Sequence, residues 1–260
     1  MIRTGLLTAL AFAGLSGAAL AADLPARKGP VLAPIAPVFT WTGFYAGIHA
    51  GAVFTDNNIR TEGTAANTIA NVTFSRRPPS LSVSDTGFIG GAQIGYNYQI
   101  GQIVLGAEAD LSYTDLKKRE SFVGTTNALS SFRQEMEYFG TVRLRAGYAF
   151  DRLLVFATGG LAYGDVKNSA TFFSAAVPGQ VDYVGSRDDV EIGWTVGGGL
   201  EYAFTNNLSV KAEYLYYDLG KRKVPVNLQP VGPAGGSYVS RFENTGHIVR
   251  AGLNYRFSTF

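Results

Sequence analysis

Eight segments of the chain alternate between apolar residues on one parity and polar or small residues on the other. The segments are 44–54, 88–100, 103–114, 134–150, 153–164, 190–204, 208–217 and 245–257. A period of two is typical of β-strands, because successive side chains of a strand point to opposite faces. The pattern is weakest in 153–164, where both parities are apolar or small. The chain is therefore expected to be all-β, with eight long strands.

The charged residues within these segments all lie on the polar parity. They are Glu108, Asp110, Glu135, Glu137, Arg143, Arg145, Glu191, Glu201, Lys211, Glu213, Arg250 and Arg256. A soluble β-sandwich, with its polar face in water and its apolar face in a core, would show the same alternation. Alternation alone therefore leaves open which solvent each face meets.

Three further features favour a transmembrane barrel. The segments are longer than the five or six residues that are usual for soluble strands. Aromatic residues stand at both ends of the apolar face, as the interfacial girdles of membrane barrels do. Short connections near 99–102, 151–152 and 205–207 alternate with long ones, which are 55–86, 116–133, 165–189 and 218–244.

Together these features predict an eight-stranded, antiparallel, up-and-down transmembrane β-barrel. Such a barrel leaves no backbone group unpaired, so it can lie in lipid. Short turns are expected in the periplasm with both chain termini, and four long loops are expected outside the cell. The apolar face then meets acyl chains, and the charged residues face the lumen.

The N-terminal residues 1–21 have the composition of a signal peptide. Arg3 supplies the positive region, 6–15 form a short apolar core, and Ala19-Leu20-Ala21 is a cleavage site of the A-x-A type. An uncleaved membrane anchor is the alternative, although the core is too short to span a bilayer. Residues 22–42 are expected to form a Pro-rich periplasmic lead-in, and 43–260 the barrel.

Composition excludes several classes of function. The chain has no cysteine, so thiolate metal sites and thiol nucleophiles are excluded, and no metal site is predicted. A net charge of +2 does not suggest a nucleic-acid partner. The G-x-S-x-G and H-E-x-x-H motifs are both absent. We therefore expect no catalytic residues and no enzyme activity.

Four stretches resemble a known family: AADLP at 21–25, FTWTGFYAGIHAG at 39–51, GGAQIGYNYQIG at 90–101 and VRAGLNYRF at 249–257. They are similar to the small outer-membrane β-barrel proteins of alphaproteobacteria, the outer membrane immunogenic protein or porin family, which have a transmembrane barrel like that of OmpA. The resemblance implies a bacterial outer-membrane location. It also implies one of three functions, because family members are described as structural surface antigens, as porins or as hemin-binding proteins.

The last strand resembles the C-terminal signal that hands outer-membrane proteins to the barrel-assembly machinery. The residues that match are Val249, Ala251, Leu253, Tyr255 and Phe257. In that signal the aromatic residue is normally the last of the chain, whereas Ser258, Thr259 and Phe260 follow it here. We therefore expect the working signal to end at Phe257.

The lumen charges have two interpretations, a narrow ion path or a salt-bridged plug. An eight-stranded barrel is just wide enough for side chains to fill it, which favours the plug. The leading hypothesis is thus a structural surface protein with no cofactor. The alternatives are a narrow porin for small solutes and a hemin-binding surface protein, for which His49 and His247 are the only histidines.

Two basic triplets, Lys117-Lys118-Arg119 and Lys221-Arg222-Lys223, begin the expected outer loops. Lipopolysaccharide phosphates lie at that height, and cations near them are favourable. The triplets are therefore predicted to contact lipopolysaccharide, with outer-membrane lipid as the other partner. The alternative is ordinary solvated loop charge.

Overall fold

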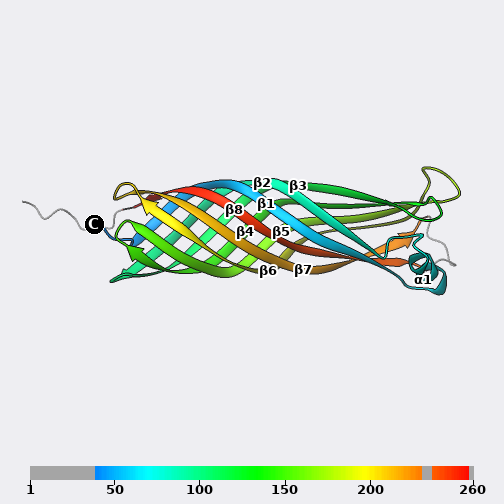
Figure 1. Ribbon diagram of the computed structural model, residues 1–260, viewed down its shortest axis with the longest axis horizontal. Coiled ribbons are helices and arrows are strands. Elements are labelled where there is room, and N and C mark those ends of the chain that lie inside the picture. The colour runs from blue at the N-terminus through cyan, green and yellow to red at the C-terminus, as the bar shows by residue number, and fades with distance from the viewer. Residues whose placement is uncertain (1–38, 230–235, 258–260) are drawn as a thin grey trace, which may run out of the picture. The chain divides into compact units, whose positions relative to one another are not determined.

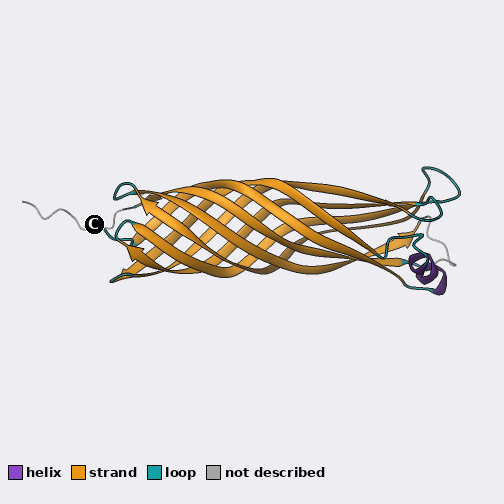
Figure 2. Cartoon of the chain, viewed as in Figure 1, coloured by secondary structure: helices purple, strands orange, loops and turns teal. Residues whose placement is uncertain are grey.

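The structure is a computed structural model, and it describes residues 39–229 and 236–257. Eight antiparallel strands follow one another around a closed barrel in chain order, which confirms the predicted fold class (Figure 1, Figure 2). The strands are β1 (Gly43–Gly63), β2 (Ser80–Ile100), β3 (Ile103–Val123), β4 (Leu129–Phe150), β5 (Leu153–Phe173), β6 (Val181–Ala203), β7 (Leu208–Leu228) and β8 (Tyr238–Arg256). The predicted signal peptide and most of the lead-in lie outside the described residues.

The two ends of the barrel differ. At one end, the turn end, β2–β3 and β4–β5 are joined by two-residue turns at 101–102 and 151–152. At the other end, the α1 end, β1 and β2 are joined by a longer connection that contains the helix α1 (Ala66–Thr73). Figure 2 shows the helix and the turns at opposite ends of the barrel. No helix in the described part of the chain has the length and hydropathy to cross a membrane.

In the half of the barrel near the turn end, apolar side chains point outward and charged ones point inward. On β4, Val142 and Leu144 are 55% and 72% exposed, whereas Arg143 and Arg145, which alternate with them, are 1% and 4% exposed. This is the arrangement that a barrel needs in hydrocarbon, where outward groups meet acyl chains. The alternation of the sequence therefore assigns the faces of this half correctly.

The prediction of four long outer loops is wrong, because most of those residues continue the strands. In the α1 half the alternation persists, but here the inward residues are apolar and the outward residues are polar. On β2, for example, Val83 is buried in the interior while Ser82 and Ser84 are exposed. Outward residues there do not need to be apolar once the wall has left the membrane. A prediction that relies on outward apolar residues consequently ends each strand too early.

The interior is built in layers. An apolar layer at the turn end contains Trp41, Leu154 and Phe156. Next comes a layer of charged residues, and above it a second apolar layer that includes Phe139 and Ile248. A third apolar layer lies near the α1 end, formed by Ile59, Val83, Phe132, Ala170, Phe172, Val224, Val226, Tyr238 and Phe242.

β-bulges fit the second apolar layer to the wall, among them one on β3 and one on β4. The register shifts between Tyr113 and Leu116 of β3, and again between Met136 and Phe139 of β4. A bulge adds one residue and turns the next side chain to the other face. Met136, which has the outward parity in the sequence, is therefore buried inside.

Both ends of the interior are covered by described residues. At the turn end the Trp41 amide donates to Gln99 Oε1 (2.7 Å), and its indole Nε1 donates to the Asp151 carbonyl (3.1 Å). At the α1 end Arg77, which follows the helix, is buried and donates to the carbonyls of Leu129 (2.9 Å) and Phe173 (2.7 Å). The segment after α1 is thereby fastened to β4 and β5.

The outward position of Val142 generates a test of the strand parity. Val142 pairs with Ala109 and Leu161 in the apolar band. A charged side chain on the lipid face near the bilayer midplane costs about 2–4 kcal/mol, but only about 0–1 near the interface. We expect Val142→Arg to lower the free energy of unfolding in lipid vesicles by that larger amount, as measured by urea titration.

Val190→Arg is the matched control, because Val190 is 66% exposed on β6 and lies four residues beyond Trp194, towards the α1 end. It should cost at most about 1 kcal/mol, as expected near the interface. Equal costs for the two variants would contradict the assigned membrane band.

Candidate functional site

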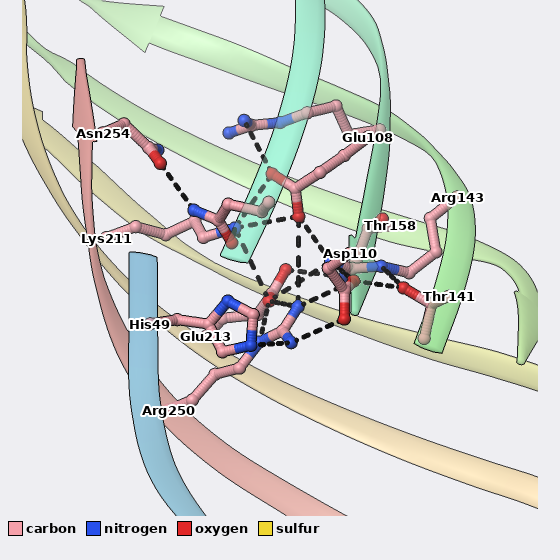
Figure 3. Close-up of polar contacts among 12 residues, drawn as sticks. His49, Glu108, Asp110, Thr141, Arg143, Thr158, Lys211, Glu213, Arg250 and Asn254 are labelled. Carbon is pink, nitrogen blue, oxygen red and sulfur yellow. Dashed lines mark hydrogen bonds and ion pairs between the residues drawn. The ribbon is translucent and has the colours of Figure 1, made fainter. Parts of the chain in front are cut away.

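The charged layer contains eight buried residues that we call the lumen charge network: Glu108, Asp110, Arg143, Arg145, Glu201, Lys211, Glu213 and Arg250. They come from β3, β4, β6, β7 and β8. Figure 3 shows side chains of the network converging inside the wall, namely Glu108, Asp110, Arg143, Lys211, Glu213 and Arg250. The register sets opposite charges side by side, since Glu108 pairs with Arg143 and Glu213 pairs with Arg250. Four cations therefore meet four anions.

Arg143 occupies the centre of the network. Its Nη1 donates to Glu213 Oε1 (2.7 Å), and its Nη2 contacts both Glu108 and Asp110 Oδ2, the latter at 3.2 Å. Its Nε donates to Thr141 Oγ1 (2.8 Å), and that hydroxyl donates to Asp110. All of the guanidinium nitrogens thus have acceptors, which is the condition under which a buried cation is tolerated.

Arg250 and Lys211 approach the same carboxylates from β8 and β7. Arg250 donates from Nε to Glu213 Oε2 (2.8 Å) and from Nη1 to Asp110 Oδ1 (3.0 Å). Lys211 Nζ donates to both oxygens of Glu108 at 2.9 Å (Figure 3). Glu108, Asp110 and Glu213 are therefore each shared between at least two cations.

Arg145 extends the network towards the turn end. Its Nη2 donates to Glu201 Oε2 (2.8 Å), and its guanidinium carbon lies 4.2 Å from the centre of the Phe156 ring in the apolar layer. Tyr45 accepts from Arg145 (3.1 Å) and donates to Glu108 Oε2 (2.7 Å). The Tyr45 ring lies across Gly95, where an added Cβ would come 2.4 Å from it.

The structure shows neutral partners that the sequence reasoning did not single out. Gln93 accepts from Lys211 (2.9 Å) and donates to Asn254, while Ser209 donates to Glu201 Oε1 (2.6 Å). These residues and Tyr45 have the inward parity, which is the signal that could have identified them. They supply hydrogen bonds to carboxylate and ammonium groups whose hydrogen-bonding capacity is not filled by the ion pairs alone.

Four predicted lumen residues lie elsewhere. Glu191 is buried nearer the α1 end, where it pairs with Arg222 at 3.2 Å, and Glu135 is buried beside Arg133. Arg256 is half-buried at the turn end, with its guanidinium carbon 4.5 Å from the centre of the Phe39 ring.

Glu137 does not face the lumen, so this part of the prediction is wrong. The bulge between Met136 and Phe139 turns Glu137 outward, where it lies 3.8 Å from Lys117 and 3.7 Å from Lys167. Parity counted along a strand is lost at a bulge, because the bulge inserts one residue.

The basic triplets also need correction, because they lie within β3 and β7 rather than at the starts of loops. Strand alternation separates their members: Lys117, Arg119, Lys221 and Lys223 are exposed, whereas Lys118 and Arg222 are only partly exposed and lie on the inward parity. Arg222 contacts the buried Glu191, as described above. Moreover, β3 and β7 lie four strands apart in the eight-stranded closed order, so the triplets do not form one patch.

The two histidines lie on opposite faces of the wall. His49 is buried, and its Nε2 lies 2.8 Å from Ser112 Oγ and 3.2 Å from Arg250 Nη1. His247 is exposed on the outer face, with its Nδ1 2.6 Å from Tyr214 Oη. They do not converge on a common site. Among the described residues no cluster of three or more His, Cys, Asp or Glu side chains could hold a metal ion.

The predicted assembly signal lies on the outward face of the turn-end part of β8 and continues to Phe257, just after the strand. Its five residues are exposed side by side with the lipid faces of β1 and β7: Val249, Ala251, Leu253, Tyr255 and Phe257. Tyr255 and Phe257 pack with their ring centres 5.3 Å apart. Residues 258–260 lie outside the described part, and recognition by the assembly machinery stays a prediction.

A closed barrel with an apolar outer band, aromatic girdles and a charged interior defines an outer-membrane β-barrel protein. The chain belongs to the outer membrane protein beta-barrel domain family, whose model matches residues 7–257. This membership confirms the predicted family resemblance and the outer-membrane location.

Two relatives and one solved structure illustrate the similarity. The chain is 40% identical to the 31 kDa outer-membrane immunogenic protein of Brucella melitensis biotype 1, covering 92% of this chain and 93% of the relative. It is 33% identical to a 22 kDa outer membrane protein of Rhizobium leguminosarum bv. viciae, covering 86% and 82%. The outer membrane protein OprG of Pseudomonas aeruginosa has a TM-score of 0.50 at 12% identity, covering 85% of this chain and 99% of that one, which shows the shared fold alone.

The central position of Arg143 generates a stability prediction. Arg143→Gln leaves Glu213, 2.7 Å away, without one of its cations, so we expect a loss of about 3–5 kcal/mol in the free energy of unfolding in vesicles. Glu213→Gln should cost a similar amount, and the double variant should cost less than the sum by about 0.5–3 kcal/mol.

Arg187→Gln serves as the control, because Arg187 pairs with Asp189 on the exposed surface and should contribute about 0–1 kcal/mol. Strict additivity of Arg143→Gln and Glu213→Gln would show that the two side chains do not act as one network.

Proposed function

We propose that the protein is a structural surface protein of the outer membrane whose lumen is filled by side chains. The observation that carries the proposal is the lumen charge network, in which four buried cations and four buried anions satisfy one another across the barrel. A permeant ion would have to break charge-assisted bonds that are already formed. In a medium of low dielectric constant such bonds are strong.

The apolar layers on either side of the network support the same conclusion. Towards the turn end a solute meets Leu154, Phe156 and the lead-in residue Trp41, all of them buried. Towards the α1 end it meets Phe139 and Tyr217, whose ring centres lie 4.9 Å apart. A hydrated ion loses its water in such a layer and gains no polar partner, which is costly. The narrow porin is therefore the weaker alternative.

We propose that the turn end and both chain termini are periplasmic and that the α1 end is outside the cell. Short turns at one end and longer connections at the other are the usual arrangement of outer-membrane barrels. The relatives named as immunogenic outer-membrane proteins agree with an exposed end. Cleavage of residues 1–21 and insertion by the barrel-assembly machinery complete this proposal.

The hemin-binding alternative receives no support from the histidines, since His49 is buried among network residues and His247 faces outward. The relatives carry the names of outer-membrane and immunogenic proteins rather than of enzymes. We accordingly infer a role in the architecture and surface of the envelope, without catalysis.

Conductance of the refolded protein in a planar bilayer tests the closed lumen. We expect no unitary current steps from protein whose folding is established by heat-modifiable gel migration, because the network and its flanking layers leave no polar path. The same silence is expected after Glu137→Gln, which alters a charge outside the barrel.

Reproducible steps whose size or ion selectivity changes in Glu108→Gln or Arg143→Gln, but not in Glu137→Gln, would contradict the proposal. They would make the lumen a pore and the protein a narrow porin.

A further inference from the structure

Three cations stand side by side on the outer face of the α1 half. Arg60 of β1 pairs directly with Arg241 of β8, and Arg241 pairs directly with Lys223 of β7. We call these three residues the cation row. Each cation has a sequence neighbour on its own strand whose side chain points inward and is fully or almost fully buried. These neighbours are Ile59, Phe242 and Val224. The row therefore points away from the barrel.

The cation row is only partly neutralised by the protein. Arg241 Nη2 lies 3.1 Å from Glu62, and the neighbouring Lys221 donates to Glu243 at 2.6 Å. Within the part of the chain that the structure describes, Arg60 and Lys223 have no carboxylate within 4.0 Å. The row and the neighbouring Lys221 contribute four positive charges, and Glu62 and Glu243 contribute two negative ones. The net charge of this group of residues is therefore 4 − 2 = +2.

Like charges at directly opposite positions of neighbouring strands destabilise a sheet. The wall nevertheless sets Arg60, Arg241 and Lys223 in one row, with both available carboxylates already engaged. An external anion that bridges the row would relieve this repulsion. Guanidinium groups bind phosphate and carboxylate through paired hydrogen bonds, and an ammonium adds a compact charge.

The height of the row indicates which anion it meets. On β1 the aromatic girdle ends at Phe54, which pairs with His247 of β8. Arg60 lies six residues farther along the strand, which is about 20 Å of strand and, at the usual tilt, about 15 Å of height. Phospholipid headgroups extend only about 5–8 Å from the hydrocarbon core. The row therefore lies above the phospholipid headgroups, at the level of glycolipid sugars.

We propose that the cation row binds the phosphate or carboxylate groups of lipopolysaccharide sugars packed against the side of the barrel. The inference deepens the proposed function and rests on it for the orientation of the α1 end. It also replaces the predicted contact through the two basic triplets, because of those six residues only Lys223 belongs to the row.

Cations elsewhere in the α1 half, which have carboxylate partners of their own, offer a control. Lys167 of β5 lies 3.7 Å from Glu137 and 3.8 Å from Asp165, and Arg187 of β6 contacts Asp189. Arg187 is exposed although it has the inward parity, Lys167 is partly exposed on the outer face, and both already have carboxylate partners in the protein. Their removal changes the net charge by as much as removal of Arg60 and Lys223.

The test is a titration of the folded barrel, held in zwitterionic detergent, with fluorescently labelled rough lipopolysaccharide, followed by fluorescence anisotropy. Arg60→Gln/Lys223→Gln should weaken binding about thirtyfold, since each cation near an anionic lipid surface contributes roughly a factor of five. Lys167→Gln/Arg187→Gln should bind as the unmodified protein does. Heat-modifiable migration establishes that all three proteins are folded.

Lipopolysaccharide stripped of phosphate and with its carboxylates reduced should bind the unmodified protein as weakly as the double variant binds the native glycolipid. Equal affinity of the three proteins, or an equal loss in both double variants, would overturn the proposal. Displacement of the labelled lipid by inorganic phosphate at a concentration no higher than that of the lipid would also overturn it, by showing a site for a small soluble anion. None of these outcomes depends on conductance, so the bilayer experiment tests the closed lumen independently of the binding titration.

Discussion

The contact of Arg143 with three carboxylates is the interaction on which the interior of the barrel depends. Glu108 and Asp110 come from the neighbouring strand β3, whereas Glu213 comes from β7 on another side of the wall. The guanidinium therefore ties strands together across the lumen as well as along the sheet. Buried charges are costly one at a time, so each partner in this arrangement requires the others.

The same eight strands face lipid in one half of the barrel and water in the other. Near the turn end its outward residues are apolar and its inward residues are charged, as at Val142 and Arg143. In the α1 half the outward residues include Arg60 and Lys223, and the interior holds an apolar cluster that includes Phe242. The reversal marks the level at which the strands leave the lipid and need a core of their own. The α1 half then resembles a water-soluble barrel built on a membrane-embedded one.

Much of this architecture could be predicted from the sequence, because period-two alternation with segregated charges reports both strand and face. The fold, the strand order and the inward position of residues such as Glu108 and Arg250 follow from that pattern. Glu137 could not be placed, because the bulge beside Met136 breaks the parity and has no signal in the alternation.

The true strand lengths were missed because Ser82 and Ser84 carry no outward apolar signal. The cation row was missed for a different reason: Arg60 and Arg241 are 181 positions apart in the chain and meet only through barrel closure. Cross-strand register between the first and last strands is not encoded in either strand alone. The basic triplets attracted attention because their members are adjacent in sequence, which in a strand sends them to opposite faces.

The central claim, that the lumen is filled, is tested most directly by the accessibility of a thiol placed in it. The chain has no cysteine, so Ser112→Cys introduces a single thiol beside His49, and Ser84→Cys places one on the exposed outer face. Both proteins would be folded in vesicles or micelles and treated with a small, charged, water-soluble thiol reagent. The filled lumen predicts that Ser84→Cys is labelled completely while Ser112→Cys stays unlabelled until the barrel is unfolded. Labelling of folded Ser112→Cys at a rate close to that of Ser84→Cys would contradict it.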